Sequence, residues 1–114
     1  MSKWVANAPV IIAAVSDRGN FVSRIGNYFR RTEFYLVDQG ISGEHFVLRA
    51  HDLGLGTCWI GWLNSDKAAK FFKLPKGKKV EHLIAVGYPA PETAQDKPHP
   101  RKPFEEIVSY NEYK

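Results

Sequence analysis

The sequence predicts a single domain built from both β-strands and α-helices. Residues 8–15 form a continuous apolar run with β-branched side chains, as expected of a buried strand, and residues 80–88 (VEHLIAVGY) are predicted to be a second buried strand. Residues 31–53 instead place apolar side chains three, four or seven positions apart, which is the spacing of a helical face. A chain of 114 residues with 44% apolar composition has room for one hydrophobic core and not for two.

The first predicted strand is bounded by Pro9 and by the polar run SDRGN. Residues 17–31 are polar with scattered aromatic side chains, and we expect a loop with some helix there. The helix predicted over 31–53 has an apolar face and a neighbouring apolar stripe, which together predict that the helix is largely buried. The face consists of Phe34, Val37, Ile41, His45 and Leu48, and the stripe of Phe46, Val47 and Ala50.

Three glycines lie within or directly after this predicted helix. Gly40 and Gly43 lie inside it, where each costs about 0.5 to 1 kcal/mol relative to alanine. Either another element, such as a second helix or a symmetry-related copy, approaches closely at these glycines, or an otherwise strong helix tolerates them. Gly54 is expected to end the helix as a C-terminal glycine.

The second half of the chain is also predicted to alternate between strands and helices. Residues 57–60 suit a short strand, and residues 64–66 (NSD) form a helix N-cap ahead of KAAKFFKL, which Pro75 and Gly77 should end. After the strand predicted at 80–88, the proline-rich run PAPETAQDKPHPRKP predicts an extended, irregular surface segment. The tail FEEIVSYNEY is expected to add a turn of helix or to pair with a neighbouring subunit.

Charge and composition limit the classes of binding partner that the protein is expected to have. The net charge is +4, but the basic residues fall in three separate polar segments interrupted by acidic ones, so no continuous basic stripe predicts nucleic-acid binding. The longest apolar stretch is far too short to cross a bilayer, and MSKW does not resemble a signal peptide. We therefore expect a cytoplasmic protein with neither nucleic acid nor membrane as partner. The lone Cys58 excludes a disulfide or a structural zinc site within one chain.

No catalytic side-chain pattern stands out. Cys58 with His45 or His51 is a conceivable pair, but a lone cysteine in an apolar run usually packs as a small hydrophobe. His45 is expected to be a hydrogen-bonded core residue, and His82 and His99 are isolated. HExxH, paired-carboxylate and phosphate-loop patterns are absent from the sequence, so hydrolytic and metal chemistry are poorly supported and no metal site is predicted.

The stretch GLGTCWIG, residues 54–61, admits two interpretations. Its glycines, cysteine and tryptophan either turn the chain and fill a core, or they let the backbone approach a flat ligand closely. In the second interpretation WIGW lies against a planar ring, backbone N–H groups near Gly61 bond to that ring, and Arg101 pairs with a phosphate. This combination suits a planar, phosphorylated cofactor, although each part also has a structural explanation.

The order of several segments resembles the latter two-thirds of the FMN-dependent nitroreductase family. The segments are WVANAPVIIAAV, FYLVDQGISGEHFVLRAHDLGLGTCWIGW, KLPKGKKVEHLIAVGYP and PRKPFEEIV. The resemblance implies an α+β fold with a central mixed or antiparallel β-sheet flanked by helices, in an intertwined homodimer with two FMN sites at its interface. It implies a close helix contact across the dimer at Gly40 and Gly43.

The same resemblance implies which residues hold the cofactor. Trp59, Ile60, Gly61 and Trp62 match the segment that runs along the flavin ring, and Arg101 matches a position that contacts the FMN phosphate. No side chain is expected to be catalytic, because the flavin carries hydride from NADH or NADPH to a nitroaromatic, quinone or similar acceptor.

One departure from the family pattern weakens this expectation. Family members usually begin with a helix carrying an Arg-Arg-Ser type motif and a later Asn-rich loop, whereas this chain starts at MSKWVANAP, so residues 1–114 are expected to be a partial domain. Loss of two charge-assisted contacts would weaken FMN binding by about two to four orders of magnitude. We therefore weigh two hypotheses. The favoured one is a flavoprotein oxidoreductase, and the alternative is a flavin-free truncated paralogue or partner subunit with a scaffold or dimerisation role.

Overall fold

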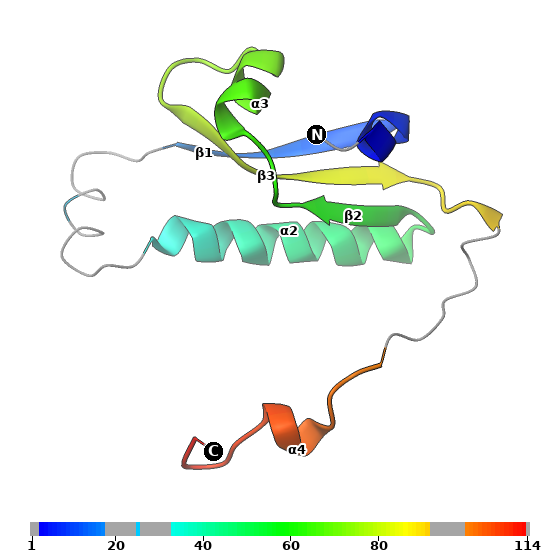
Figure 1. Cartoon of the computed structure of the whole chain (residues 1–114), viewed down its shortest axis with the longest axis vertical. Coiled ribbons are helices and arrows are strands. Elements are labelled where there is room, and N and C mark those ends of the chain that lie inside the picture. The colour runs from blue at the N-terminus through cyan, green and yellow to red at the C-terminus, as the bar shows by residue number, and fades with distance from the viewer. Residues whose placement is uncertain (1–2, 18–24, 26–32, 92–99, 114) are drawn as a thin grey trace.

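The computed structural model describes residues 3–17, 25, 33–91 and 100–113. Three strands form one antiparallel sheet in the order β1-β3-β2, with helix α2 on one face and α3 with the short helix η1 on the other (Figure 1). The α+β class is therefore confirmed. The elements are η1 (Lys3–Asn7), β1 (Val10–Asp17), α2 (Phe34–Asp52), β2 (Gly56–Ile60), α3 (Ser65–Phe71), β3 (Lys78–Gly87) and α4 (Phe104–Ile107).

Strand β3 is the centre of the sheet, because it pairs with both other strands. Its register with β1 shifts at one point: Ala14 lies opposite His82, but the next residue, Val15, lies opposite Val80. Glu81 is thus the extra residue of a β-bulge, which interrupts the alternation of side chains along β3. The bulge was not predicted from the sequence.

One face of the sheet carries the hydrophobic core. Its buried residues come from η1, from the end of the edge strand β2 and from the central strand β3: Val5, Ile60, Val80, Leu83 and Ala85. Helix α3 covers this face. Its start is fixed as predicted, since the Asn64 side chain accepts a hydrogen bond from the Lys67 N–H at 2.9 Å. The Ser65 hydroxyl also donates to the Val80 carbonyl at 2.7 Å and ties α3 to β3.

Helix α2 covers the other face, but not with the predicted side chains. Its least exposed positions are spaced by four or three residues and are mostly small or polar: Tyr35, Gln39, Gly43, Val47 and Ala50. The predicted apolar face points away from the sheet, and Val37, Ile41 and Leu48 are all more than half exposed. That part of the prediction is wrong for the single chain, because the small residues let α2 approach the sheet and leave the larger apolar residues outside. His45 is exposed too, and is not a core residue.

The end of α2 agrees with the sequence. Gly54 has φ of +76°, a conformation that glycine adopts without a steric penalty. Its N–H donates to the His51 carbonyl, and the next N–H, of Leu55, donates to Ala50, each at 2.9 Å. These two bonds form a Schellman motif.

Predicted and observed elements agree within a few residues, apart from two segments. The loop predicted at 17–31 and much of the proline-rich run lie outside the described residues. The tail does form a helical turn, α4. Residues 100–113, here called the C-terminal arm, project away from the sheet beyond α2 (Figure 1). None of the described helices is long and apolar enough to span a membrane.

The core on the α3 side gives a stability prediction. Leu83→Ala removes a side chain that is only 2% exposed, and should lower the free energy of unfolding by about 2 to 5 kcal/mol. Leu53→Ala makes the same change at a 58% exposed leucine and should cost less than about 0.5 kcal/mol. Thermal or urea unfolding followed by circular dichroism compares the two, and equal losses would contradict this placement of the core.

Candidate functional site

The segment from Trp59 to Trp62 forms the end of the edge strand β2 and the turn after it. Trp59 lies opposite Ile84 and Ile60 lies opposite Leu83, so the β3 ladder fixes both residues. Successive strand side chains point to opposite faces. Ile60 accordingly enters the core, whereas Trp59 points toward α2.

The Trp59 indole occupies a notch in α2. A Cβ added at Gly43 would lie 2.2 Å from the Cη2 atom of Trp59, so only glycine fits there. The expectation of a close approach at Gly43 is confirmed, but the neighbour is a strand of the same chain and not a second helix. At Gly40 nothing lies within 4 Å of an added Cβ, so the structure supplies no neighbour there.

The Trp59 ring also contacts His82. The two ring centroids are 4.6 Å apart and the planes are inclined by 39°. The sequence marked His82 only as isolated. The position of His82 inside a largely apolar predicted strand was a sign of a specific role. Its contact with Trp59 could not be predicted without knowing the register of the strands.

Gly61 and Trp62 are the open part of the segment. No atom lies within 4 Å of a Cβ added at Gly61, and the Trp62 side chain is 99% exposed. Among the residues that the structure describes, the N–H groups of Gly61 and Trp62 donate to no backbone oxygen. Exposed N–H groups beside an uncovered glycine and an uncovered aromatic ring fit the edge of a planar, hydrogen-bonding ligand such as a flavin.

An apolar cavity follows directly in the chain. It has a volume of about 270 Å³ and lies between α3 and the sheet, beginning at Leu63, one residue after Trp62. Phe71, Phe72 and Ile11 line it, and Lys67 is the charged residue at its wall. The cavity was not predicted, because it depends on how α3 sits on the sheet.

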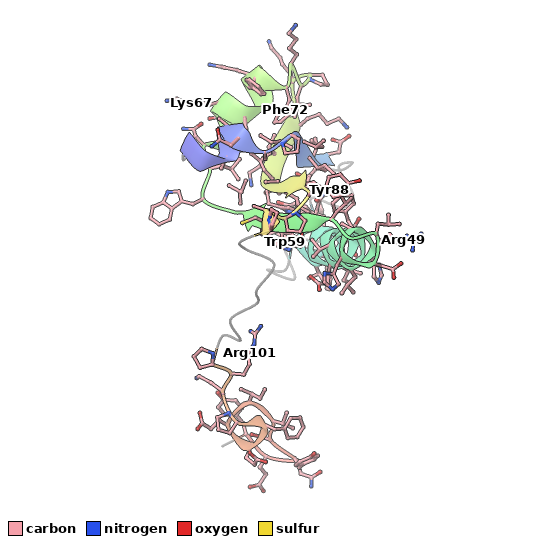
Figure 2. All side chains as sticks on the ribbon, turned by 90° about the vertical axis from the view of Figure 1, so that its right-hand side faces the viewer. Arg49, Trp59, Lys67, Phe72, Tyr88 and Arg101 are labelled. Atoms are coloured by element: carbon pink, nitrogen blue, oxygen red, sulfur yellow. The ribbon has the colours of Figure 1, made fainter. Side chains whose placement is uncertain are left out.

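Arg101 is not near this segment in the single chain. It lies exposed on the C-terminal arm, well apart from Trp59 (Figure 2). The structure therefore brings together Trp59, Ile60, Gly61 and Trp62, and leaves Arg101 on a separate element. An anion held by both parts would require the arm and the sheet to meet through another arrangement of chains.

The conceivable cysteine and histidine pair is not formed. Cys58 lies on the face of β2 opposite Trp59, whereas His45 and His51 are exposed on α2. Cys58 is also exposed, which corrects the expectation that it fills a core: it belongs to an edge strand whose outer part is uncovered. Within the described ranges, no three His, Cys, Asp or Glu side chains gather as metal ligands would.

The bulge in β3 creates a polar cluster, composed of Ser16, Tyr35, Lys79 and Glu81. The Ser16 hydroxyl donates to Glu81 at 2.6 Å, and Lys79 pairs with the same carboxylate at 2.7 Å. Burial raises the pKa of Glu81, but these two hydrogen bonds, together with the nearby charges of Lys79 and His82, outweigh burial and hold its pKa below the ordinary value. Burial and the nearby Glu81 charge raise the pKa of Tyr35, so the phenol stays neutral. The cluster explains how a carboxylate is tolerated under α2.

Comparison with known proteins identifies the fold as that of the nitroreductases. A family described as "Putative TM nitroreductase" matches residues 12–114. A nitroreductase family protein of Clostridium novyi NT is 34% identical over 79% of this chain, with a TM-score of 0.61. An FMN-dependent nitroreductase of Clostridium difficile R20291 is 23% identical over 94% of this chain, with a TM-score of 0.67. This chain belongs to the nitroreductase family.

A curated relative of similar identity bears the name NADPH-dependent oxidoreductase and comes from Staphylococcus haemolyticus (strain JCSC1435). It is 33% identical over 79 residues, which are 68% of this chain and 31% of the relative. The chain covers 48% of the Clostridium novyi protein and 60% of the Clostridium difficile one. It therefore spans between about a third and three fifths of the length of these relatives.

The notch at Gly43 gives a prediction with a built-in control. Gly43→Ala places a Cβ where the Trp59 ring lies, and should destabilise the fold by about 1 to 3 kcal/mol. Gly40→Ala makes the same substitution three residues earlier in open space, and should stabilise the helix by up to about 1 kcal/mol. Urea unfolding measures both, and near-ultraviolet circular dichroism reports the tryptophan environment. A stabilising Gly43→Ala with an unchanged spectrum would refute the notch.

Proposed function

We propose that this chain is a flavin-dependent oxidoreductase that uses FMN and passes hydride from NADH or NADPH to an acceptor such as a nitroaromatic or a quinone. The observation that carries the proposal is the open segment at Gly61 and Trp62, with its exposed N–H groups, in a chain of nitroreductase fold. Support also comes from relatives whose names specify FMN or NADPH dependence. FMN, when bound, supplies the hydride transfer.

The residues of this chain would bind and orient the cofactor. The N–H groups of Gly61 and Trp62 would donate hydrogen bonds to the polar edge of the ring, and the absence of a side chain at Gly61 allows close approach. The Trp62 indole would cover part of the ring and exclude water. Ile60, fixed in the core, and Trp59, fixed between α2 and His82, would hold the backbone in position.

We propose that the working form is a homodimer. Many large apolar side chains of the described residues are exposed, including those on the outward face of α2 and the aromatic residues of the arm. Burial of this surface against a second copy would supply the hydrophobic free energy that the single chain lacks.

The same assembly would complete the cofactor site. The arm that carries Arg101 extends away from its own sheet, so in a dimer it can lie against an interface that neither copy forms alone (Figure 1). Arg101 would then pair with the FMN phosphate through two parallel hydrogen bonds. A flavin-free subunit is the second candidate, and the separation of Arg101 from Trp59 in the single chain favours it (Figure 2).

An arginine substitution tests the cofactor proposal. Arg101→Ala should weaken FMN binding roughly 10- to 100-fold, because it removes a charge-assisted contact to the phosphate. Lys102→Ala removes an equal charge at the next exposed position and should change the dissociation constant less than about threefold. Quenching of flavin fluorescence during titration measures both. Failure of the unmodified protein to bind FMN at any concentration would favour the flavin-free candidate.

A pair of leucines tests the dimer proposal. Leu48 lies on the outward apolar face of α2 and is 57% exposed, whereas Leu53 at the end of the helix is 58% exposed. Leu48→Ser should shift the protein toward the monomer, with a dimer dissociation constant raised at least about tenfold. Leu53→Ser should leave the dimer unchanged. Sedimentation equilibrium distinguishes the outcomes, and a monomeric unmodified protein would exclude the proposal.

A further inference from the structure

The stack of His82 on Trp59 lies directly behind the proposed flavin-contacting segment. The indole is held between the backbone of α2 at Gly43 and the imidazole of β3. Trp59 lies on β2, two residues before Gly61, and Gly61 directly follows the end of that strand. A movement of the indole would therefore be transmitted to the point where the chain leaves β2.

His82 has one unusual atom. Its Nε2 is buried and has no hydrogen-bond partner in the part of the chain that the structure describes. A neutral imidazole can leave one nitrogen as an unpaired acceptor, whereas an imidazolium carries a proton on both nitrogens. Protonation at Nε2 would bury a charged donor without an acceptor, and attraction of the cation to the Trp59 ring offsets only part of that cost.

Few charged groups face His82 from the surrounding elements. On β3 the neighbour is Glu81, whose carboxylate oxygens already accept from Ser16 and Lys79. Strand β2 carries no charged residue, and on β1 the one charge is Asp17, which pairs with Lys78. Helix α2 brings two titratable groups, Tyr35 and Asp38, to the pocket that Ser16 and Asp17 also line. None of these groups accepts a hydrogen bond from His82 Nε2 in the described part of the chain.

We propose that His82 is a positioning residue, whose neutral ring clamps Trp59 against Gly43 and so sets the position of Gly61 and Trp62, and that protonation of His82 releases this clamp. The proposal rests on the proposed function for its consequence, a pH-dependent affinity for FMN. The stack, the notch and the unpartnered nitrogen carry the clamp itself, and do not depend on FMN.

The direction of the pH effect follows from the burial of His82. Burial lowers the pKa of His82 below its ordinary value of 6.5, and the Glu81 charge opposes this only in part. The unfolded or released state therefore takes up a proton at higher pH than the clamped state. The stabilisation by the neutral ring is complete above pH 6.5 and is lost as the pH falls from 6.5 toward the lowered pKa.

The test follows the indole N–H signal of Trp59 by nuclear magnetic resonance in the full chain labelled with ¹⁵N-tryptophan, assigned with Trp59→Phe. Between about pH 5 and 8 the signal should move with a midpoint below the ordinary histidine pKa. His82→Phe keeps a flat ring that cannot be protonated, and should abolish the movement. His51→Phe, the same change at an exposed histidine of α2, should preserve it.

A Trp59 signal that stays constant in the unmodified chain overturns the proposal, even where His82→Phe fails to fold. So does a signal that titrates equally in folded His82→Phe. The second measurement is FMN affinity, which should weaken roughly tenfold from about pH 7.5 to 5.5 in the unmodified protein and less than twofold in His82→Phe. If FMN does not bind at any pH, the proposed function fails, and the Trp59 signal alone still decides the clamp.

Discussion

The contact between Gly43 of α2 and the Trp59 indole sets how closely the helix lies on the sheet. Because a side chain at residue 43 would collide with that ring, the helix can settle only with its small residues inward. The larger apolar side chains of α2 are then turned outward, and β2 is held from both of its faces: Ile60 in the core and Trp59 under the helix. This arrangement fixes the position of Gly61, which directly follows β2, while the space around Gly61 stays open.

Much of the fold could be predicted from local chemistry. A continuous apolar run located β1 and a largely apolar segment located β3, helical spacing located α2, and the caps at Gly54 and Asn64 placed helix ends correctly. The inward face of α2 could not be chosen, because the helix has two apolar faces and steric fit at Gly43 decided between them. The bulge at Glu81 was equally hidden, since it depends on the register between two strands far apart in sequence.

The candidate site was predicted in part. The segment Trp59 to Trp62 does present an open glycine and an uncovered aromatic ring at Trp62, whereas the Trp59 ring is 40% exposed and packs against Gly43 and His82. Arg101 was assigned to the cofactor site by family resemblance, whereas the structure places it on the projecting arm, apart from Trp59. The environments of His82 and Cys58 could not be predicted from the local sequence. His82 contacts Trp59 on the neighbouring strand, and Cys58 is exposed because the edge of β2 is uncovered.

These features describe a chain that displays more apolar surface and more open hydrogen-bonding groups than it can satisfy alone. A second copy of the chain would cover the apolar surface, and a flavin would accept hydrogen bonds from the open N–H groups. Native mass spectrometry of the protein saturated with FMN tests this claim most directly, because one spectrum gives both the number of chains and the number of cofactors. We expect a complex of two chains, of 12.9 kDa each, that holds two FMN molecules in total. A spectrum of single chains without FMN would contradict this claim.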